Sequence, residues 1–204
     1  MKKTIALFAV LALCLTLCLG LCACGRDSGA TEPVSGNKAS EEDLTEISLT
    51  VPGAYLDENK TQADYDAEAS EAGFQSAVLN ADGSVTYVMT KARHRELLSG
   101  MAAEIDQMLS EMTASGEYPN FVSITHNDDY TEFTVVSRAK ELDFAEMSAS
   151  WAITLLSERY AAFRGEEAEN CHIEYINENT GEAFNIANSA EMESALAGLV
   201  GAAK

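Results

Sequence analysis

The chain has 204 residues, of which 33 are acidic and 13 are Lys or Arg, and its formal charge is −20 at pH 7. A chain of this length can bury one substantial core but not two, so we predict a single folded domain. The charge disfavours nucleic acid and anionic lipid head groups as partners of the bulk surface, and it is typical of an exposed protein that stays soluble.

The N-terminal segment has the pattern of an export signal. Lys2 and Lys3 precede an apolar run over residues 5–21, and a basic start with an apolar middle is what defines such a signal. The run is also nearly long enough to span a bilayer, so an uncleaved transmembrane anchor is the alternative.

Residues 21–24, Leu-Cys-Ala-Cys, separate these two interpretations. They resemble the bacterial lipobox, in which an aliphatic residue stands three positions before the cysteine and a small residue stands directly before it. Only Cys24 follows a small residue, because the cysteines nearer the start all follow leucine, which is too bulky. Those cysteines are Cys14, Cys18 and Cys22.

The lipobox resemblance implies a signal peptide over residues 1–23 and a diacylglyceryl group on the thiol of Cys24. It also implies a protein held on the outer, extracytoplasmic face of the cell membrane. Residues 25–43 contain one aliphatic side chain larger than alanine, so residues 24–43 are predicted to be a lipidated cysteine and a disordered tether. Such a tether would hold the domain about 24 Å from the membrane. This layout is similar to that of small uncharacterised lipoproteins of Gram-positive cell surfaces, a class that implies no activity.

The predicted domain covers residues 44–204. Alternation predicts a strand over residues 47–51, and Thr61 with Asp64 resembles a capping box that opens a short helix to Ala72. Three β-hairpins and two long helices then alternate, and a short helix with Met192, Leu196 and Val200 in line ends the chain. The hairpins are predicted at residues 76–90, 121–136 and 171–186, and the long helices at residues 91–115 and 141–164.

The first long helix is bounded by Thr90, which can accept hydrogen bonds from the first free amides, and by Gly116, which suits a left-handed stop. Its apolar residues recur at helical spacing, and three of them are methionines. A methionine stripe can form an adaptable peptide groove, but we interpret this one as core filling.

The second long helix carries Phe144, Met147, Trp151 and Leu155 on one stripe. Further apolar residues widen that stripe, so we predict that this helix is the more buried of the two and that Trp151 lies in the core. The widening residues are Ile153, Leu156, Tyr160 and Phe163.

These elements predict an α+β fold. We expect the successive hairpins to form one antiparallel sheet of about six to seven strands, with helices packed on one face and solvent on the other. A unit of helix, glycine stop and hairpin occurs three times, with stops at Gly73, Gly116 and Gly165.

Motifs that carry chemistry are not found in the sequence. His94, His126 and His172 have no metal-ligand spacing and are interpreted as surface or turn residues, so no metal or cofactor is predicted. Cys171 adjoins His172, but successive strand side chains point to opposite faces, which prevents a nucleophile–base pair. Since Cys171 is the one cysteine after Cys24, no internal disulfide is available, and we expect it to be a small buried apolar residue.

The basic residues are concentrated at two predicted helix starts. Lys91, Arg93 and Arg95 open one long helix, and Arg138 and Lys140 open the next. Nearby carboxylates are the ordinary explanation. The alternative is a shared anion site for a phosphate- or carboxylate-bearing cell-wall polymer, built from these cations and the two helix N-termini, if both helices begin at the same end of one sheet.

We therefore predict a lipid-anchored surface protein that acts as a binding or structural module, with a cell-wall polymer or a surface protein as its partner. The alternative is an enzyme or a solute-binding protein that acts on a cell-wall or extracellular substrate. About 150 folded residues do not readily supply the two lobes of a solute-binding protein, and an enzyme would require titratable groups that converge in a pocket.

Overall fold

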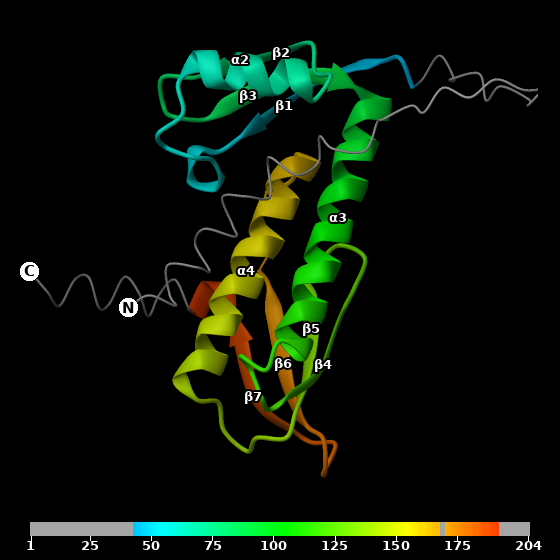
Figure 1. The fold of residues 1–204 in the computed structure, drawn as a ribbon, viewed down its shortest axis with the longest axis vertical. Coiled ribbons are helices and arrows are strands. Elements are labelled where there is room, and N and C mark those ends of the chain that lie inside the picture. Colours follow the sequence, from blue (N-terminus) through cyan, green and yellow to red (C-terminus); the bar gives the residue numbers. More distant parts are fainter. Residues whose placement is uncertain (1–42, 168–169, 192–204) are drawn as a thin grey trace, which may run out of the picture. The chain divides into compact units, whose positions relative to one another are not determined.

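The structure is a computed structural model that describes residues 43–167 and 170–191. The chain divides into two compact units, residues 1–100 and 101–204, although the sequence predicts one domain. Each unit has a sheet of its own (Figure 1). The predicted signal peptide, Cys24, the tether before residue 43 and the predicted C-terminal helix from residue 192 onward lie outside the described residues. Among those described, no helix combines the length and the apolar content that crossing a membrane requires.

The first unit contains a three-stranded antiparallel sheet in the order β1-β3-β2, made of Glu46–Val51, Val85–Thr90 and Ser76–Leu79. A 3-10 turn over Gly53–Tyr55 and the helix α2 (Gln62–Glu71) connect β1 to β2. One face of the sheet is buried because its strands alternate apolar and polar residues. The buried residues are Leu49, Val51, Ala77, Val85, Tyr87 and Met89, and α2 adds Tyr65 and Ala69.

The predicted caps in this region are confirmed. The backbone N–H of Thr61 donates to the Asp64 carboxylate at 2.8 Å, and both halves of the capping box are present at the start of α2. Thr90 accepts a hydrogen bond from the Arg93 N–H at 3.2 Å, directly before α3 (Lys91–Ala114). Gly116 follows that helix with a φ of 75°, so the stop is left-handed as expected.

The second unit contains a four-stranded sheet in the order β4-β5-β6-β7. Its strands are β4 (Phe121–His126), β5 (Glu132–Ser137), β6 (His172–Asn177) and β7 (Ala183–Asn188), and α4 (Phe144–Arg164) connects β5 to β6. β4 pairs antiparallel with β5 and β6 with β7, but β5 and β6 are parallel.

An α+β fold with successive hairpins is therefore confirmed, but a single antiparallel sheet is not, because the strands form two sheets. The three helix–hairpin units are not confirmed either, since the first hairpin joins β1 in one sheet while the other two hairpins share the second sheet. The parallel pair has a topological cause. A helix between two strands returns the chain to its starting end, so the second strand runs in the same direction as the first.

The helix α4 packs on the second sheet through the residues that the sequence predicts to widen its apolar stripe, and not through the stripe that contains Trp151. Trp151 is 42% exposed and Phe144 is 85% exposed, so the prediction that Trp151 lies in the core is wrong. The buried face of the helix carries small residues as well as large apolar ones. The residues buried on that face include Ala149, Ser150, Ile153, Leu156, Ser157, Tyr160 and Phe163. The prediction that α4 is more buried than α3 is confirmed, since α3 buries only Ile105 and Leu109 completely.

The start of α4 also differs from the prediction, because the helix begins at Phe144 rather than near Glu141. Asp143 accepts a hydrogen bond from the Glu146 N–H at 2.8 Å, and Glu146 accepts one from the Asp143 N–H at 3.0 Å. This capping box fixes the first turn. Arg138 and Lys140 therefore lie in the loop before the helix and not in its first turn.

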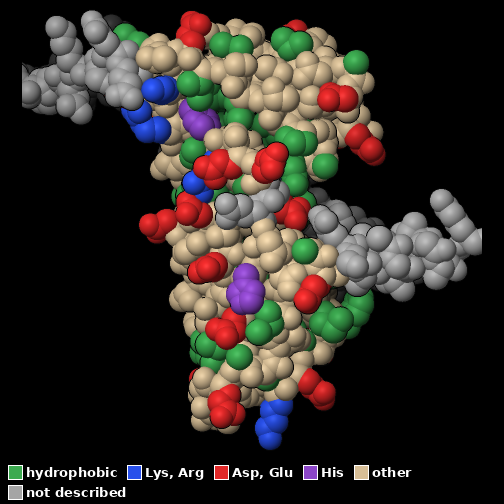
Figure 2. Space-filling view, turned by 180° about the vertical axis from the view of Figure 1, so that it is seen from behind, with side chains coloured by type: hydrophobic (Ala, Val, Ile, Leu, Met, Phe, Trp, Pro, Cys, Tyr) green, Lys and Arg blue, Asp and Glu red, His purple; other side chains and the backbone are tan. Residues whose placement is uncertain are grey.

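The excess of acidic over basic residues in the sequence is visible on the protein surface. On the face in Figure 2, Asp and Glu side chains are spread widely, whereas Lys and Arg side chains are few. A surface of this kind presents a negative potential to any ligand that approaches it.

Candidate functional site

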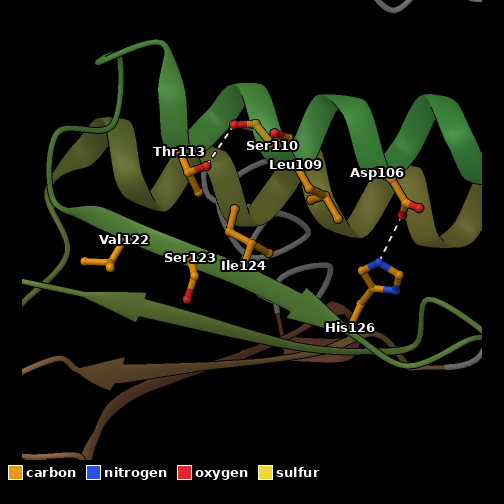
Figure 3. A pocket seen from close by; sticks show the side chains of 8 residues that line it. All are labelled: Asp106, Leu109, Ser110, Thr113, Val122, Ser123, Ile124 and His126. Atoms are coloured by element: carbon orange, nitrogen blue, oxygen red, sulfur yellow. Dashed lines mark hydrogen bonds and ion pairs between the residues drawn. The ribbon is translucent and has the colours of Figure 1, made fainter.

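A pocket of about 320 Å³ lies in the second unit between α3 and the edge strand β4 (Figure 3). The part of α3 that lines it begins at Asp106, so both walls belong to residues 101–204. The pocket combines apolar side chains, three hydroxyl groups and one histidine–carboxylate pair. Its lining consists of Asp106, Leu109, Ser110, Thr113, Val122, Ser123, Ile124 and His126.

The positions of these side chains follow from the periodicities of the two elements. On α3, Asp106, Leu109, Ser110 and Thr113 are spaced i, i+3, i+4 and i+7, so they share one face of the helix. On β4, side chains of alternate residues share a face, which is why Ile124 and His126 point together towards α3 in Figure 3. The register of β4 shifts between Phe121 and Ser123, next to the three consecutive residues of the strand that line the pocket, Val122, Ser123 and Ile124.

His126, Asp106 and Tyr130 form a hydrogen-bonded cluster at one end of the pocket. His126 Nε2 lies 3.0 Å from Asp106 Oδ1, and Tyr130 Oη lies 2.8 Å from the same oxygen. The rings of His126 and Tyr130 stack with their centroids 4.3 Å apart. The cluster therefore connects the end of β4 to α3 within one unit.

The contacts of His126 restrict what its ring can do chemically. Nδ1 lies 2.8 Å from the carbonyl oxygen of Asn127, which can only accept, so Nδ1 must carry a proton. Nε2 lies 3.0 Å from the Asp106 carboxylate, so both ring nitrogens have an oxygen partner.

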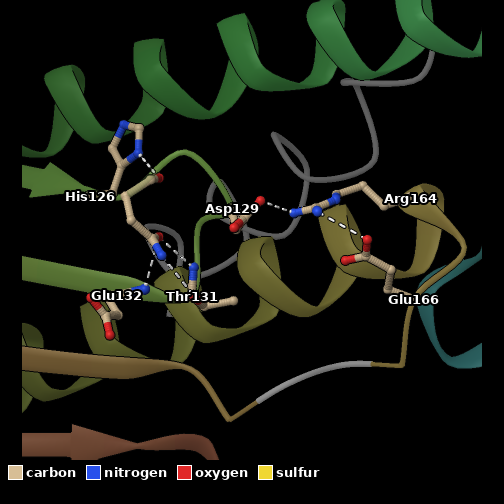
Figure 4. Close-up of polar contacts among 7 residues, drawn as sticks. His126, Asp129, Thr131, Glu132, Arg164 and Glu166 are labelled. Atoms are coloured by element: carbon tan, nitrogen blue, oxygen red, sulfur yellow. Dashed lines mark hydrogen bonds and ion pairs between the residues drawn. The ribbon is translucent and has the colours of Figure 1, made fainter.

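Polar contacts fix the turn from β4 to β5, which follows His126 and contains Tyr130 (Figure 4). The side-chain oxygen of Asn127 accepts from the backbone N–H groups of Thr131 and Glu132, at 2.9 and 3.1 Å. Tyr130 adopts a φ of 57°, a left-handed conformation that is uncommon for a bulky residue and is maintained only where the surroundings determine it. Arg164 at the end of α4 pairs with Asp129 in the same turn.

Tyr130 is almost completely buried, at 4% exposure. Burial, and then the hydrogen bond to Asp106, raises the pKa of the Tyr130 phenol above its usual value. The phenol therefore stays protonated at neutral pH and donates a hydrogen bond. Its acceptors are the Asp106 carboxylate and, at 3.2 Å, the backbone oxygen of Ala102.

The structure places Lys91, Arg93 and Arg95 in the first turns of α3, within the first unit. Arg93 pairs with Glu96 at 2.8 Å and donates to the backbone oxygen of Ala72. Arg95 pairs with Asp43. These contacts agree with the explanation that carboxylates offset the basic charge at this helix start.

Arg138 and Lys140 lie in the second unit, in the loop between β5 and α4. Arg138 pairs with Glu178 at 3.2 Å, and Lys140 is exposed. Neither unit by itself contains all five basic residues, and the two helices follow hairpins of different sheets. The shared anion site stays a prediction. It is conditional on both helices starting at the same end of one sheet, and the structure has two sheets instead.

Cys171 is completely buried, as expected. Burial raises the pKa of its thiol, although hydrogen bonds with Ser157 and Thr154 oppose this effect. A buried thiol with a raised pKa is a poor nucleophile. His172 next to it is half-buried on β6, and His94 is half-buried on α3.

His126, Asp106 and Tyr130 are the site residues that the sequence does not reveal. The sequence indicates only a surface or turn residue at His126, and 20 positions separate it from Asp106. The one local signal is the turn sequence after β4, whose asparagine and two aspartates are typical of a tight hairpin connection. Nothing in that signal indicates which helix face the histidine would meet.

The fold and the pocket define an acidic α+β protein of two units, with a helix–strand pocket in the second. Among the described residues, no group of three or more His, Cys, Asp or Glu side chains is arranged to hold a metal ion. Comparisons of the chain with protein-family models, with curated proteins and with solved structures found no match.

Proposed function

We propose that this chain is a lipid-anchored protein of the outer face of a cell membrane, and that its second unit is a binding module that takes its ligand in the pocket between α3 and β4. The anchor is the diacylglyceryl group on Cys24, and the ligand belongs to a surface protein or a cell-wall component.

The sequence supports the anchor. The basic start, the apolar run over residues 5–21 and the small residue before Cys24 occur together, and the tether that follows would give the folded units room to move at the membrane. Lipidation requires only these local features, so this part of the proposal is independent of the fold.

One observation carries the binding function. His126 engages both ring nitrogens with oxygen atoms, at 2.8 and 3.0 Å, so it is held in place as one of the polar and apolar contact groups of the pocket. Leu109 and Ile124 give it apolar walls, while Ser110, Thr113 and Ser123 give it hydroxyl groups. A concave site with a few converging polar groups is the usual form of a binding site.

Metabolic labelling with a fatty acid tests the anchor. The wild-type chain should incorporate the label and move to the membrane fraction, whereas Cys24→Ala should remain an unlabelled precursor that is about 23 residues longer. Cys22→Ala is the matched control and should be labelled like the wild type. Equal labelling of Cys24→Ala would contradict the anchor.

A pocket-blocking variant tests the binding function. Ser110 is an exposed residue that lines the pocket, and Ser110→Tyr should fill the opening without disturbing the core. Asn179→Tyr places the same ring in the exposed turn between β6 and β7. Cross-linking on intact cells should yield partners that are lost with Ser110→Tyr and kept with Asn179→Tyr. Identical partners for both variants would contradict the pocket as the binding site.

A further inference from the structure

We propose that β4 receives an extended, basic peptide segment, which adds to the second sheet as an outer strand and places one apolar side chain in the pocket. This inference rests on the proposed binding function and names the class of its partner.

The position of β4 in the sheet makes strand addition possible. β4 is at one end of the order β4-β5-β6-β7, and among the described residues it pairs only with β5. An edge strand presents a row of N–H and C=O groups that another chain can pair with. Extended peptides use such edges in several families of recognition domains.

The hydrogen-bond pattern identifies which residues of β4 face outward. Asn127 N–H donates to the Glu132 carbonyl at 3.1 Å, so this pair is hydrogen-bonded. Hydrogen-bonded and non-hydrogen-bonded pairs alternate along an antiparallel ladder. The pairs of Ile124 with Val135 and of His126 with Phe133 are therefore non-hydrogen-bonded. The N–H and C=O groups of Ile124 and His126 point away from β5, towards the position of an added strand.

The first sheet has an edge that is treated differently. There the Gln62 side chain accepts from the Leu79 N–H at 2.8 Å and donates to the Ala77 carbonyl at 2.8 Å. This amide occupies the outward groups of β2 as a neighbouring strand would. In the described part of the second unit, no side-chain amide occupies Ile124 and His126 of β4 in this way.

The helix α3 supplies the second wall of a groove beside β4. Figure 3 shows the helix running along the strand, with Leu109 and Ile124 pointing into the space between them. A peptide strand beside β4 would direct every second side chain towards α3. The pocket of about 320 Å³ can accept an apolar side chain there, between Leu109 and Ile124, with the hydroxyl groups of Ser110 and Thr113 at the rim.

Charge determines the kind of peptide. The segment from residue 101 to residue 137 includes the part of α3 that lines the groove, together with β4 and β5. It contains seven Asp or Glu residues and no Lys or Arg. Asp106 lines the pocket, and Glu132 lies exposed on the outer face of β5. Complementary charge favours the encounter and suppresses partners of the wrong sign, so the added segment should be basic.

The same charge argues against a second copy of this chain as the occupant. Pairing of β4 with β4 would bring two copies of the net-acidic segment side by side, and surfaces of like charge repel one another. A basic peptide replaces that repulsion with attraction.

Peptide binding to the full-length, lipid-anchored chain in detergent tests the inference. The probe is a short synthetic peptide that alternates lysine and valine. One control replaces lysine with glutamate, and a second keeps the side chains but carries a methyl group on every backbone nitrogen. NMR should show that the basic peptide shifts the amide signals of Ile124 and His126 and slows their hydrogen exchange about tenfold or more. The acidic and methylated peptides should do neither.

A charge variant makes the test specific to the groove. Ser110→Lys adds a cation at the pocket, one helical turn from Asp106 on the same face of α3, and it should weaken binding of the basic peptide about twofold to fivefold. Asn179→Lys makes the same charge change in the turn between β6 and β7 and should leave the affinity within twofold of the wild type, about the limit of such a measurement.

Several results would overturn the inference. These are no binding, equal binding of the acidic or methylated peptide, signal changes away from β4, and equal loss in the two lysine variants. Dimerisation of the chain through β4 without peptide would also overturn it, in favour of a second copy. None of these results affects the labelling of Cys24 or the loss of cross-linked partners with Ser110→Tyr, so failure of the inference and failure of the proposed function can be distinguished.

Discussion

The side-chain amide of Asn120, one residue before β4, donates a hydrogen bond to the carboxylate of Glu146 in the first turn of α4, over 2.9 Å. Glu146 is completely buried, and its second carboxylate oxygen accepts from the Asp143 N–H at 3.0 Å. One buried carboxylate therefore joins the entry to β4 to the start of α4. Buried charges are tolerated where hydrogen bonds satisfy them.

The first prediction follows from this contact. Asn120→Ala removes the donor and leaves a buried carboxylate oxygen without its partner, so the free energy of unfolding should fall by about 1 to 3 kcal/mol. Urea denaturation followed by circular dichroism measures the change. Glu141→Ala, an exposed position before α4, should leave the midpoint unchanged. Equal midpoints for Asn120→Ala and the wild type would show that the contact does not stabilise the second unit.

A second prediction concerns Gly53, after β1. A Cβ atom at Gly53 would lie 2.7 Å from the backbone oxygen of Gly83, which is too close for a carbon–oxygen contact, and backbone cannot move aside as a side-chain end can. Gly53→Ala should therefore lower the free energy of unfolding of the first unit by about 1 to 3 kcal/mol. At Gly83 itself φ is 85° with nothing within 4 Å of a Cβ, so Gly83→Asn should cost less. The reverse order of the two variants in thermal unfolding would contradict this.

The exposure of Trp151 gives a third prediction. It is the one tryptophan in the chain, so its fluorescence reports on this position alone. The folded protein should show the emission of a solvent-exposed indole that iodide quenches readily. Trp151→Ala should change stability by about 0.5 kcal/mol or less, whereas Ile153→Ala, two residues away and completely buried, should cost about 2 to 5 kcal/mol. A shielded emission spectrum or a large loss with Trp151→Ala would place the buried face of α4 differently.

The two faces of α4 explain why the sequence alone misassigned Trp151. Both faces carry apolar residues at helical spacing, and the sequence prediction combines them in one broad stripe that includes Trp151. The stripe that packs contains Ala149, Ser150 and Ser157 between its large residues. The large residues of that stripe, Ile153, Leu156 and Phe163, are buried with them, whereas Trp151 is exposed. Periodicity identifies an amphipathic helix, but it cannot choose between two candidate stripes.

Local features were predicted more reliably than the pairing of strands. The capping box of Thr61 and Asp64, the cap at Thr90 and the left-handed stop at Gly116 depend on residues within one turn of the chain. The parallel contact of β5 with β6 depends on where α4 returns the chain. The pocket also depends on long-range packing, because Asp106 contacts His126 only when β4 is packed against α3.

Cys171 provides a fourth prediction. Burial raises the pKa of its thiol, so the fraction of reactive thiolate is low at neutral pH and access is blocked. Peptide mapping after treatment with iodoacetamide should find Cys171 unmodified in the native chain and modified after unfolding in urea. Mapping reads this cysteine separately from those near the N-terminus. Modification of Cys171 in the native chain at the rate of a free peptide thiol would mean that β6 opens to solvent.

The last prediction concerns stability at alkaline pH and rests on Tyr175. Burial raises the pKa of this phenol to about 12, although its hydrogen bond with Ser150, over 2.6 Å, lowers it in part. An unfolded tyrosine ionises near pH 10. Between these values the unfolded chain loses a proton that the folded chain keeps, so the free energy of unfolding falls as the pH rises.

Tyr175→Phe removes this contribution, which is at most about 1.4 kcal/mol per pH unit. The variant should be less stable than the wild type at pH 8, because Ser150 loses its partner, and the difference should narrow from about pH 10 towards pH 12. The decline with pH should not vanish, since the pKa values of Tyr65, Tyr118, Tyr130 and Tyr160 are also raised. Urea midpoints across this range provide the measurement. Parallel profiles for the two proteins would mean that Tyr175 ionises equally in the folded and unfolded chains, and so is not shielded in the core.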